Sequence, residues 1–305
     1  MIVVGGEALV DLVIAPDGSV TAKLGGGPFN AARAIGRLGS EVAFLGALSR
    51  DRFGSLLCNQ LVLDNVSDSF VQFTELPTTL ASAELDEQGA ATYHFYFSDT
   101  AAPNLHPPPL PDNLTILHVG TLGMVLQPMA STLEAVVADL NDDVLVMLDP
   151  NCRPRVTWDR VGYVSRLQRM LRRADVVKVS SDDLDFVAPH DPAGGVRMLL
   201  DGGARVVLHT DGGRSVHIHL SDSHVEVPVP EVEVVDTIGA GDSFGGAFAA
   251  WWDQAGLGRE DSQDTDALVA AVAAAVEVAA VSCTRVGAQP PRREELGSKW
   301  NPART

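Results

Sequence analysis

The most informative stretch of the chain reads Asp236-Thr237-Ile238-Gly239-Ala240-Gly241-Asp242 and continues as Ser243-Phe244-Gly245-Gly246. Residues 231–235 alternate acidic and β-branched side chains, which predicts a strand, and residues 243–252 are small and apolar, which predicts a buried helix. Between them the small residues 239–241 let the backbone approach a ligand, where the first N–H groups of a helix are unpaired and its dipole is positive. The turn therefore favours an anion such as phosphate, with the carboxylate of Asp242 beside it.

Two functions fit Asp242 at this place. An Asp at the start of a helix commonly caps it, which stabilises the helix by about 1 kcal/mol. Alternatively, Asp242 is a general base that takes a proton from a hydroxyl while amides and Mg²⁺ stabilise a transferring phosphoryl group, as a small-molecule kinase requires. The turn alone does not separate the two.

Other segments resemble the signatures of one family. Residues 236–242 resemble the Asp-Thr-x-Gly-Ala-Gly-Asp signature of the ribokinase-like (pfkB) carbohydrate kinases, and Gly25-Gly26-Gly27-Pro28-Phe29-Asn30 resembles their amino-terminal signature. Residues 148–154, 174–178 and 282–288 are similar to segments of the fructokinase branch. The resemblance covers nearly the whole chain. It implies ATP-dependent phosphorylation of a primary hydroxyl of a small sugar, such as fructose or a related keto-sugar.

The composition narrows the partners. The chain has 305 residues, 46% hydrophobic and 20% charged, which is ordinary for a globular protein with a sizeable core. Its formal charge of -18, without a cluster of basic residues, argues against binding to nucleic acid or to an anionic membrane surface. Binding ATP against this field requires local features, namely helix N–H groups, Mg²⁺ and cations such as Arg153 or Lys178.

The cysteines and the amino terminus suggest a compartment. Cys58, Cys152 and Cys283 are widely spaced, so the sequence indicates neither a disulfide framework nor a zinc site. The first residues lack the pattern of a secretory signal, and no uninterrupted apolar run of about 18 residues is long enough to cross a bilayer. We therefore expect a cytoplasmic protein.

Short apolar runs alternate with helical stretches along the chain, which predicts a mainly parallel sheet covered by helices on both faces. No linker or repeat divides them, so we expect one three-layer αβα domain of ribokinase-like fold over residues 1–305. The expected core strands are residues 2–4, 42–45, 116–119, 144–148, 176–179 and 206–208, and the expected helices are residues 30–38, 133–140, 161–172, 195–200, 243–252 and 267–282.

Two segments do not fit this alternation. Residues 11–23 and 79–97 contain alternating runs joined by the turns Pro16-Asp17-Gly18 and Asp86-Glu87-Gln88-Gly89, which predicts hairpins. They resemble the small β-sheet that forms a lid over the active site in this family and excludes competing water. The alternative is an edge hairpin without a function. Family members often form dimers through their lids, so the resemblance also implies a homodimer as one oligomeric state of this chain.

The resemblance assigns residues to the sugar. Asp11 matches the family carboxylate that holds two sugar hydroxyls, although it could also be a solvent-facing strand residue. Gly26 and Gly27 match the glycine turn under the sugar, and Asn30 matches an amide that reaches a hydroxyl, although a plain turn with an Asn cap has the same spacing. Phe97 is a candidate lid residue that supplies an apolar face.

Arg153 follows a predicted core strand at the edge where open α/β sheets bind ligands. Its forked donors suit a phosphate or an oxyanion of the substrate. The alternative is a surface ion pair with Asp149 or Asp159.

The nucleotide side departs from the family pattern. Lys178 and Ser180 match nucleotide-side positions, and relatives carry Thr-x-Gly-x-x-Gly where residues 208–214 align in two ways, with Thr210 and Gly212 as candidates. The resemblance places adenine between this loop and the helix at residues 267–282. By match to the family, Gly239, Ala240 and Gly241 supply the anion hole and Asp242 is the base.

The resemblance also implies metal ions. Many relatives have Asn-x-x-Glu where this chain has Ser180-Ser181-Asp182-Asp183, so Asp183 would hold Mg²⁺ through water with a carboxylate one methylene shorter. A monovalent cation, K⁺, is bound in several relatives by the backbone of two loops. The matching positions here are Asp236, Ile238, Ser282, Arg285 and Gly287.

Other functions remain open at this point. A 2-keto-3-deoxygluconate or nucleoside kinase would share the fold, although residues 93–102 lack an Arg that would neutralise a sugar acid. A binding protein without turnover is a further alternative, which the presence of Asp242 disfavours. A dinucleotide-dependent dehydrogenase is disfavoured because no Gly-x-Gly-x-x-Gly follows the first strand.

Overall fold

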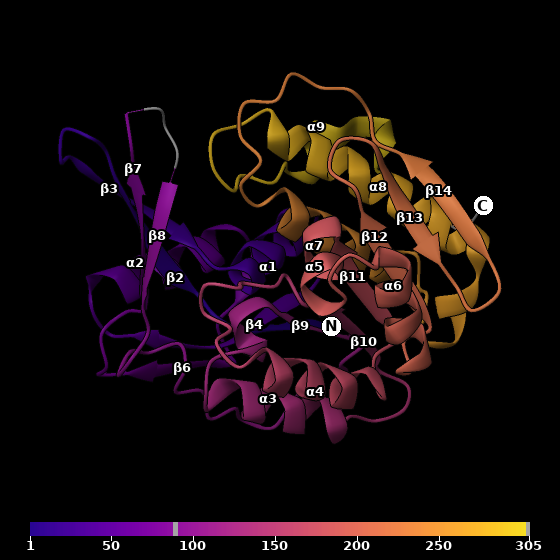
Figure 1. Ribbon diagram of the computed structural model, residues 1–305, viewed down its shortest axis with the longest axis horizontal. Coiled ribbons are helices and arrows are strands. Elements are labelled where there is room, and N and C mark those ends of the chain that lie inside the picture. Colours follow the sequence, from indigo (N-terminus) through magenta and orange to yellow (C-terminus); the bar gives the residue numbers. More distant parts are fainter. Residues whose placement is uncertain (88–90, 303–305) are drawn as a thin grey trace.

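The computed structural model describes residues 1–87 and 91–302 (Figure 1). Within this part of the chain, a ten-stranded sheet runs in the order β14-β13-β12-β11-β10-β9-β1-β4-β5, and β6 also pairs with β4. All six predicted core strands are confirmed, and they form the parallel centre of the sheet because apolar runs of this kind need both faces covered. They are β1 (Ile2–Gly5), β4 (Val42–Ser49), β9 (Ile116–Gly120), β10 (Leu145–Asp149), β11 (Val176–Ser180) and β12 (Val206–Thr210).

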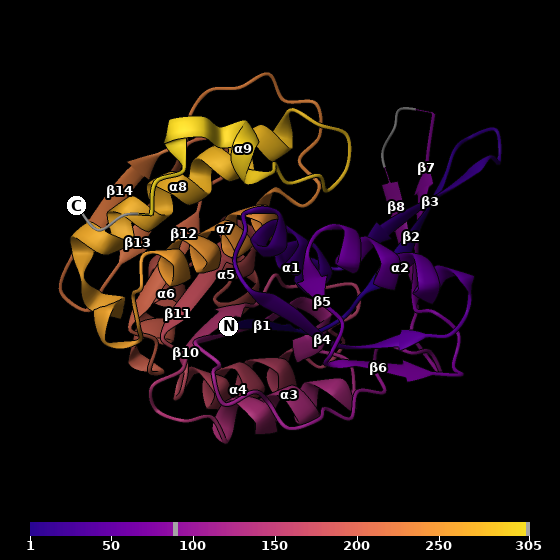
Figure 2. The same ribbon diagram turned by 180° about the vertical axis from the view of Figure 1, so that it is seen from behind.

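Helices cover both faces of this sheet (Figures 1 and 2). Within β1, Ile2 and Val4 pack toward one helix layer and Val3 toward the other, as expected for alternating strand side chains. The three-layer αβα prediction is therefore confirmed. One layer contains α1 (Gly27–Arg37), α2 (Arg52–Leu63), α7 (Ala240–Gln254) and α8 (Thr265–Cys283); the other contains α3 (Met129–Ala138), α4 (Arg160–Leu171), α5 (Ser181–Val187) and α6 (Pro192–Asp201).

The helix α8 is long and apolar enough to cross a membrane by length and composition alone, which the sequence analysis did not anticipate. Half of its most apolar window is buried inside the protein, and it packs against α7 and the strands β13 and β14. A buried core helix passes the same test.

The predicted hairpins are confirmed as a second, smaller sheet with the strand order β3-β2-β7-β8. Its strands are β2 (Leu9–Ile14), β3 (Val20–Gly25), β7 (Leu80–Leu85) and β8 (Ala91–Tyr96), and part of the predicted turn at residues 86–89 lies outside the described residues. The small sheet projects from the body beside α1 and α2 (Figure 1). The chain enters it directly after β1 and returns from β3 straight into α1.

Some elements differ from the prediction. Residues 231–235 are not a strand: Val234 and Val235 are 60% and 56% exposed, and the N–H of Val235 donates to the carbonyl of Cys283 at 2.8 Å. An alternating pattern needs a neighbouring strand to pair with, and this segment runs alone. Elements that the sequence analysis did not predict are α2, α5, β5 (Val66–Ser67), β6 (Val71–Thr74), β13 (Ser215–His219), β14 (His224–Pro228), α9 (Arg293–Leu296) and the short 3₁₀ helices, including η1 (Thr121–Met124).

Candidate active site

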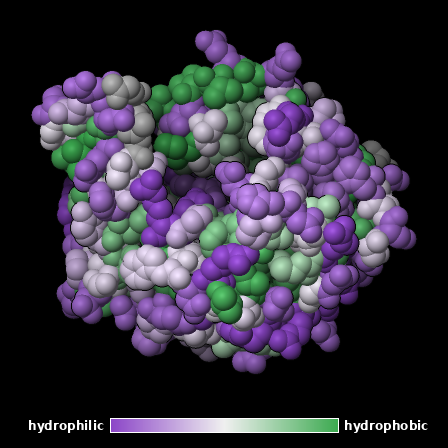
Figure 3. All heavy atoms as spheres, viewed as in Figure 1, coloured by the Kyte–Doolittle hydropathy of each residue, from purple (hydrophilic) through white to green (hydrophobic). Residues whose placement is uncertain are grey.

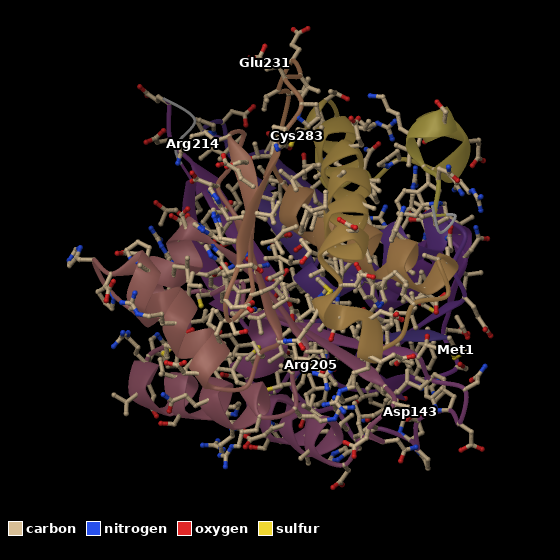
Figure 4. The ribbon with its side chains drawn as sticks, turned by 90° about the vertical axis from the view of Figure 1, so that its right-hand side faces the viewer. Met1, Asp143, Arg205, Arg214, Glu231 and Cys283 are labelled. Carbon is tan, nitrogen blue, oxygen red and sulfur yellow. The ribbon has the colours of Figure 1, made fainter. Side chains whose placement is uncertain are left out.

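The candidate site lies at the carboxyl ends of the parallel strands. Figure 4 shows Met1, Asp143 and Arg205, which precede core strands, toward one end of the molecule. Arg214 and Cys283 lie toward the opposite end in the same view. Open α/β sheets bind ligands at the carboxyl edge of their strands. On this side the surface is hollowed between the small sheet and the body, with hydrophilic side chains in the hollow (Figure 3).

The turn before α7 has the geometry of an anion site. Gly239 has φ 75°, in the left-handed region, and a Cβ there would lie 2.5 Å from the Cβ of Ala288, so the position requires glycine. The N–H of Ala240 donates to the carbonyl of Thr237 at 3.2 Å. The N–H groups of Gly241 and Asp242 begin the helix and have no acceptor four residues earlier within it, so they are available to a ligand.

Asp242 is held in place by two amides. The Nδ2 of Asn30 donates to its Oδ2 at 2.9 Å, and the Nδ2 of Asn151 donates to its Oδ1 at 3.4 Å. Burial raises the pKa of Asp242, while the bond from Asn30 and the charges of Lys178 and Arg153 oppose that rise. The carboxylate is therefore oriented, partly desolvated and able to accept a proton.

A buried ion pair lies beneath the turn. The Nζ of Lys178 is 3.1 Å and 3.2 Å from the two carboxylate oxygens of Asp149, and each side chain is 4% exposed. Burial alone would lower the pKa of Lys178, but Asp149, Asp183 and Asp242 outweigh it and the pKa is raised. A Cβ on Gly241 would lie 3.0 Å from this Nζ, so the absence of a side chain brings the anion turn next to a charged ammonium group.

Arg153 turns back onto the loop after β10. Its Nη1 donates to the Oδ1 of Asn151 at 2.6 Å and to the carbonyl of the same residue at 3.0 Å. The alternative ion pair with Asp149 or Asp159 is not formed, because Asp149 pairs with Lys178 and Asp159 accepts the N–H of Gly162 at the start of α4. Arg153 thereby fixes the amide that contacts Asp242.

The predicted sugar-facing residues come together around the start of α1. Asn30 is 5% exposed, and its Oδ1 is buried without a hydrogen-bond partner among the described residues. Asp11 lies close to Gly25, where a Cβ would collide with its Oδ2, and burial raises its pKa to about 6 against the charge of Arg153. At Gly27 a Cβ would collide with the Oγ1 of Thr121. Asn30 contacts Asp242 directly, and the charge of Arg153 acts on the carboxyl groups of both Asp11 and Asp242.

Phe97 lies farther along the small-sheet side. Its ring centroid is 5.9 Å from that of Trp158, which is 80% exposed. Both rings line a cavity of about 400 Å³ together with Val156 and Gln127. The contact between these two rings therefore connects the segment that follows the small sheet to the loop that carries Arg153.

The candidate nucleotide-binding residues Ser180 and Thr210 lie at the carboxyl ends of two neighbouring strands, β11 and β12. Ser180 pairs with Thr210 in register across β11 and β12, and the Thr210 hydroxyl donates to the carbonyl of Val179 at 3.3 Å. Gly212, with φ 58°, lies in the exposed turn between β12 and β13.

Asp183 has a function that the sequence analysis missed. Its Oδ2 accepts the N–H and the hydroxyl of Ser180, both at 2.7 Å, and its Oδ1 accepts the N–H of Cys152 at 2.5 Å. It is 3% exposed and forms a capping box at the start of α5. Asp183 thus fastens the loop after β10 to the end of β11.

The two loops predicted to hold a monovalent cation lie side by side. The Asp236 carboxylate accepts the N–H of Ile238 at 2.9 Å and the N–H of Gly287 at 2.8 Å. The Ser282 hydroxyl donates to the carbonyl of Val278, and the Arg285 side chain pairs with Glu295 at 2.6 Å. The side chains of Ser282 and Arg285 are therefore already paired, and the Ser282 carbonyl accepts the N–H of Arg285 at 3.1 Å.

Glu7 also belongs to this site and was missed by the sequence analysis. It is 1% exposed and lies between β1 and β2, and its carboxylate accepts the N–H of Gly27 at 3.1 Å. The available signal was an acidic residue two positions after a wholly apolar strand.

Comparisons with known proteins identify the family of the chain. The family model described as pfkB family carbohydrate kinase matches residues 1–295. A fructokinase of Rhizobium leguminosarum bv. trifolii is 35% identical over 261 residues, which is 82% of this chain and 79% of that protein. The crystal structure of fructokinase with bound ATP from Xylella fastidiosa superposes with a TM-score of 0.87 at 30% identity, covering 97% of this chain and 96% of the other.

A second solved structure shows the same similarity. The fructokinase from Vibrio cholerae O395 in its fructose-, ADP- and calcium-bound form has a TM-score of 0.87 at 26% identity, and the match covers 98% of both chains.

Proposed function

The chain belongs to the pfkB family of carbohydrate kinases, and we propose that it transfers the terminal phosphoryl group of ATP to a primary hydroxyl of a small sugar, fructose or a related keto-sugar. One observation carries this proposal: Asp242 is held by Asn30 and Asn151 at the first turn of α7, beside unpaired N–H groups and above the Lys178 ammonium. A proton acceptor and an anion site thus occupy one turn of helix.

The proposed mechanism needs little covalent chemistry from the protein, because phosphoryl transfer depends mainly on positioning and electrostatics. Asp11 and Asn30 would receive the sugar hydroxyls, with the Gly26–Gly27 turn under the ring. Asp242 would take the proton of the attacking hydroxyl. The N–H groups at the start of α7, with the positive helix end and Lys178 behind them, would stabilise the charge on the transferring phosphoryl group.

A magnesium ion fits this site only together with the nucleotide. Among residues 1–87 and 91–302, no group of three or more His, Cys, Asp or Glu side chains could hold a metal ion. Both oxygens of Asp183 already accept hydrogen bonds, so this residue would hold Mg²⁺ through water while the phosphates supply direct ligands. When bound, the ion would neutralise phosphate charge.

A monovalent cation is proposed for the loop pair of residues 236–238 and 282–287. The Asp236 carboxylate ties both loops together and brings their backbone next to the Gly239 turn. We expect K⁺ bound there to rigidify the turn. Replacing K⁺ by Na⁺ at constant ionic strength should lower kcat several-fold; equal rates in both salts would exclude a K⁺-dependent turn.

The identity of the sugar that accepts the phosphoryl group is the most specific element of the proposed activity. The named relatives are fructokinases. The Arg153 side chain already donates hydrogen bonds to Asn151, which disfavours its use in neutralising the carboxylate of a sugar acid. A screen of ADP release across ketoses, aldoses, sugar acids and nucleosides tests the acceptor class. Highest kcat/KM for fructose supports the proposal, whereas highest kcat/KM for 2-keto-3-deoxygluconate or a nucleoside contradicts it.

Asp242→Asn tests the chemistry itself. The substitution keeps the shape of the side chain and removes the proton acceptor, so we expect kcat to fall by roughly a factor of 100 or more. Nucleotide affinity should stay within a few fold, measured by titration calorimetry. Asp253→Asn, in the last turn of the same helix, is the matched control and should retain wild-type kcat. An unchanged kcat in Asp242→Asn would remove this residue from base catalysis.

A further inference from the structure

Glu7 joins three parts of the molecule. It lies between β1 of the central sheet and β2 of the small sheet, and it is 1% exposed. Its Oε1 accepts the N–H of Gly27 at 3.1 Å, and its Oε2 accepts the N–H of Gly123 at 3.1 Å. One carboxylate therefore links the crossing between the sheets to the start of α1 and to η1.

Glu7 replaces the missing cap of α1. The N-cap residue Gly26 has no side chain and forms no side-chain cap hydrogen bond. A Cβ on Gly26, whose φ is 113°, would lie 2.6 Å from the carbonyl oxygen of Glu7, so the turn passes too close to the backbone of Glu7 to carry a side chain. A carboxylate beside the first N–H groups is favoured by the helix dipole as well. The position of Gly26 and Gly27 thus depends on a residue 20 positions earlier than Gly27.

The second hydrogen bond extends this control to the base. Gly123 belongs to η1, which begins with Thr121, and the Thr121 hydroxyl accepts a hydrogen bond from the Nδ2 of Asn151 at 3.2 Å. Asn151 in turn contacts Asp242. The Glu7 carboxyl group therefore contacts the proposed sugar-binding side of the site at two places, the start of α1 and η1. Neither of its two hydrogen bonds reaches the proposed nucleotide side at β11 and β12.

Such a residue is expensive to bury. Desolvation raises the pKa of Glu7 to about 8, while its own N–H, the N–H of Gly27 and the charge of Arg153 oppose the rise and Asp242 adds to it. An apolar side chain would avoid this cost, and strongly perturbed carboxyl groups gather at functional sites.

We propose that Glu7 is a positioning residue that sets the affinity for the sugar acceptor by holding the Gly26–Gly27 turn and η1 through its two carboxylate oxygens. This inference rests on the proposed function, because that function assigns the turn to the sugar. Glu7 itself does not contact the reacting atoms.

Glu7→Gln is the main test. Glutamine has nearly the same shape but only one acceptor oxygen, so its NH₂ group would face one of the two N–H donors. We expect KM for the sugar to rise roughly tenfold, while KM for ATP stays within twofold and kcat within about threefold. Glu7→Asp is the second variant. It keeps a carboxyl group but cannot reach both N–H groups, so KM for the sugar should rise again, by roughly threefold or more.

Asp175→Asn is the matched control. Asp175 is 0% exposed, accepts the N–H of Val146 and pairs with Arg259 at 2.8 Å, at the amino ends of the strands. This variant should lose stability in urea denaturation while both KM values stay at the wild-type level.

The outcomes separate the two proposals. If Glu7→Gln changes both KM values equally, or neither, the positioning function is overturned. If Glu7→Gln does not fold, Glu7→Asp decides in the same way, and an unchanged KM for the sugar overturns the proposal. A wild-type protein that phosphorylates no sugar contradicts the proposed function before any variant is made.

Discussion

Lys178 places a single buried positive charge behind the turn that we propose as the anion site. Its ammonium is buried with Asp149 and lies next to Gly241, where the chain carries no side chain. In this surrounding of low polarity, a positive charge acts on a nearby phosphate more strongly than it would in water. The family resemblance assigns Lys178 to the nucleotide, but the sequence around it does not reveal Asp149 as its partner.

Lys178→Met should therefore affect both stability and rate. Removing one member of a buried ion pair leaves the other unpaired, and we expect the free energy of unfolding to fall by about 3 kcal/mol. In the double variant Lys178→Met, Asp149→Leu, stability in urea denaturation should recover in large part, because an apolar pair replaces the ionic one. The kcat should stay at least tenfold below wild type. A double variant with wild-type kcat would show that the ammonium does not assist phosphate.

Among the elements, the antiparallel edge formed by β12, β13 and β14 carries an unusual face. His209, His217, His219 and His224 stack along it, with ring centroids as close as 4.7 Å between His219 and His224. Burial and the neighbouring imidazoles lower the pKa of His219 to about 4, and burial followed by His217 lowers the pKa of His209. These rings line a cavity of about 680 Å³ beside α6. The lowered pKa values of His209 and His219 favour neutral imidazoles at these two positions of the edge.

This face predicts a loss of stability in acid. Because the folded pKa of His219 lies below the ordinary value of 6.5, the unfolded chain binds the proton more readily. The contribution of His219 to stability is full above about pH 6.5 and is lost as the pH falls toward 4. Urea denaturation at pH 7.5 and pH 5 should show a smaller pH difference for His219→Gln than for the wild type. His190→Gln, whose ring is 95% exposed, is the control. An unchanged pH difference in His219→Gln would assign the acid sensitivity to other groups.

At the scale of the whole molecule, the small sheet has two edges and exposed apolar side chains. Its outer strands are β3 and β8, and Val20, Tyr93 and Tyr96 are 57%, 41% and 54% exposed. Open strand edges with exposed apolar residues favour pairing with another strand. We therefore propose that two copies of the chain pair through this sheet.

Light scattering at micromolar concentration tests this pairing. We expect the mass of a dimer for the wild type, and a shift to the monomer for the double variant Tyr93→Glu, Tyr96→Glu. Val62→Glu places the same charge on an apolar residue of α2 that is 55% exposed, and it should leave the dimer intact. A monomeric wild type, or equal dissociation in both variants, would contradict pairing through the small sheet.

Local patterns were sufficient for much of this protein. Apolar runs identified the six parallel strands, because a strand buried on both faces needs apolar side chains throughout. Alternation and turn residues identified the hairpins of the small sheet, and the small residues at 239–241 identified the turn at the start of α7. Each of these features depends on residues that are close together in the chain.

Only the tertiary structure decided which groups meet. Asn30 contacts Asp242 across 212 positions and Asn151 contacts it across 91, while Glu7 reaches Gly123 across 116. The same holds for residues 231–235, which remain outside the sheet because no strand lies beside them. A hydrogen bond depends on the distance between two groups in space. The residues next to each of these side chains in the sequence do not reveal which distant group it contacts. The local sequence therefore determines which residues the turn contains, whereas the whole fold determines how the Asp242 side chain in it is oriented.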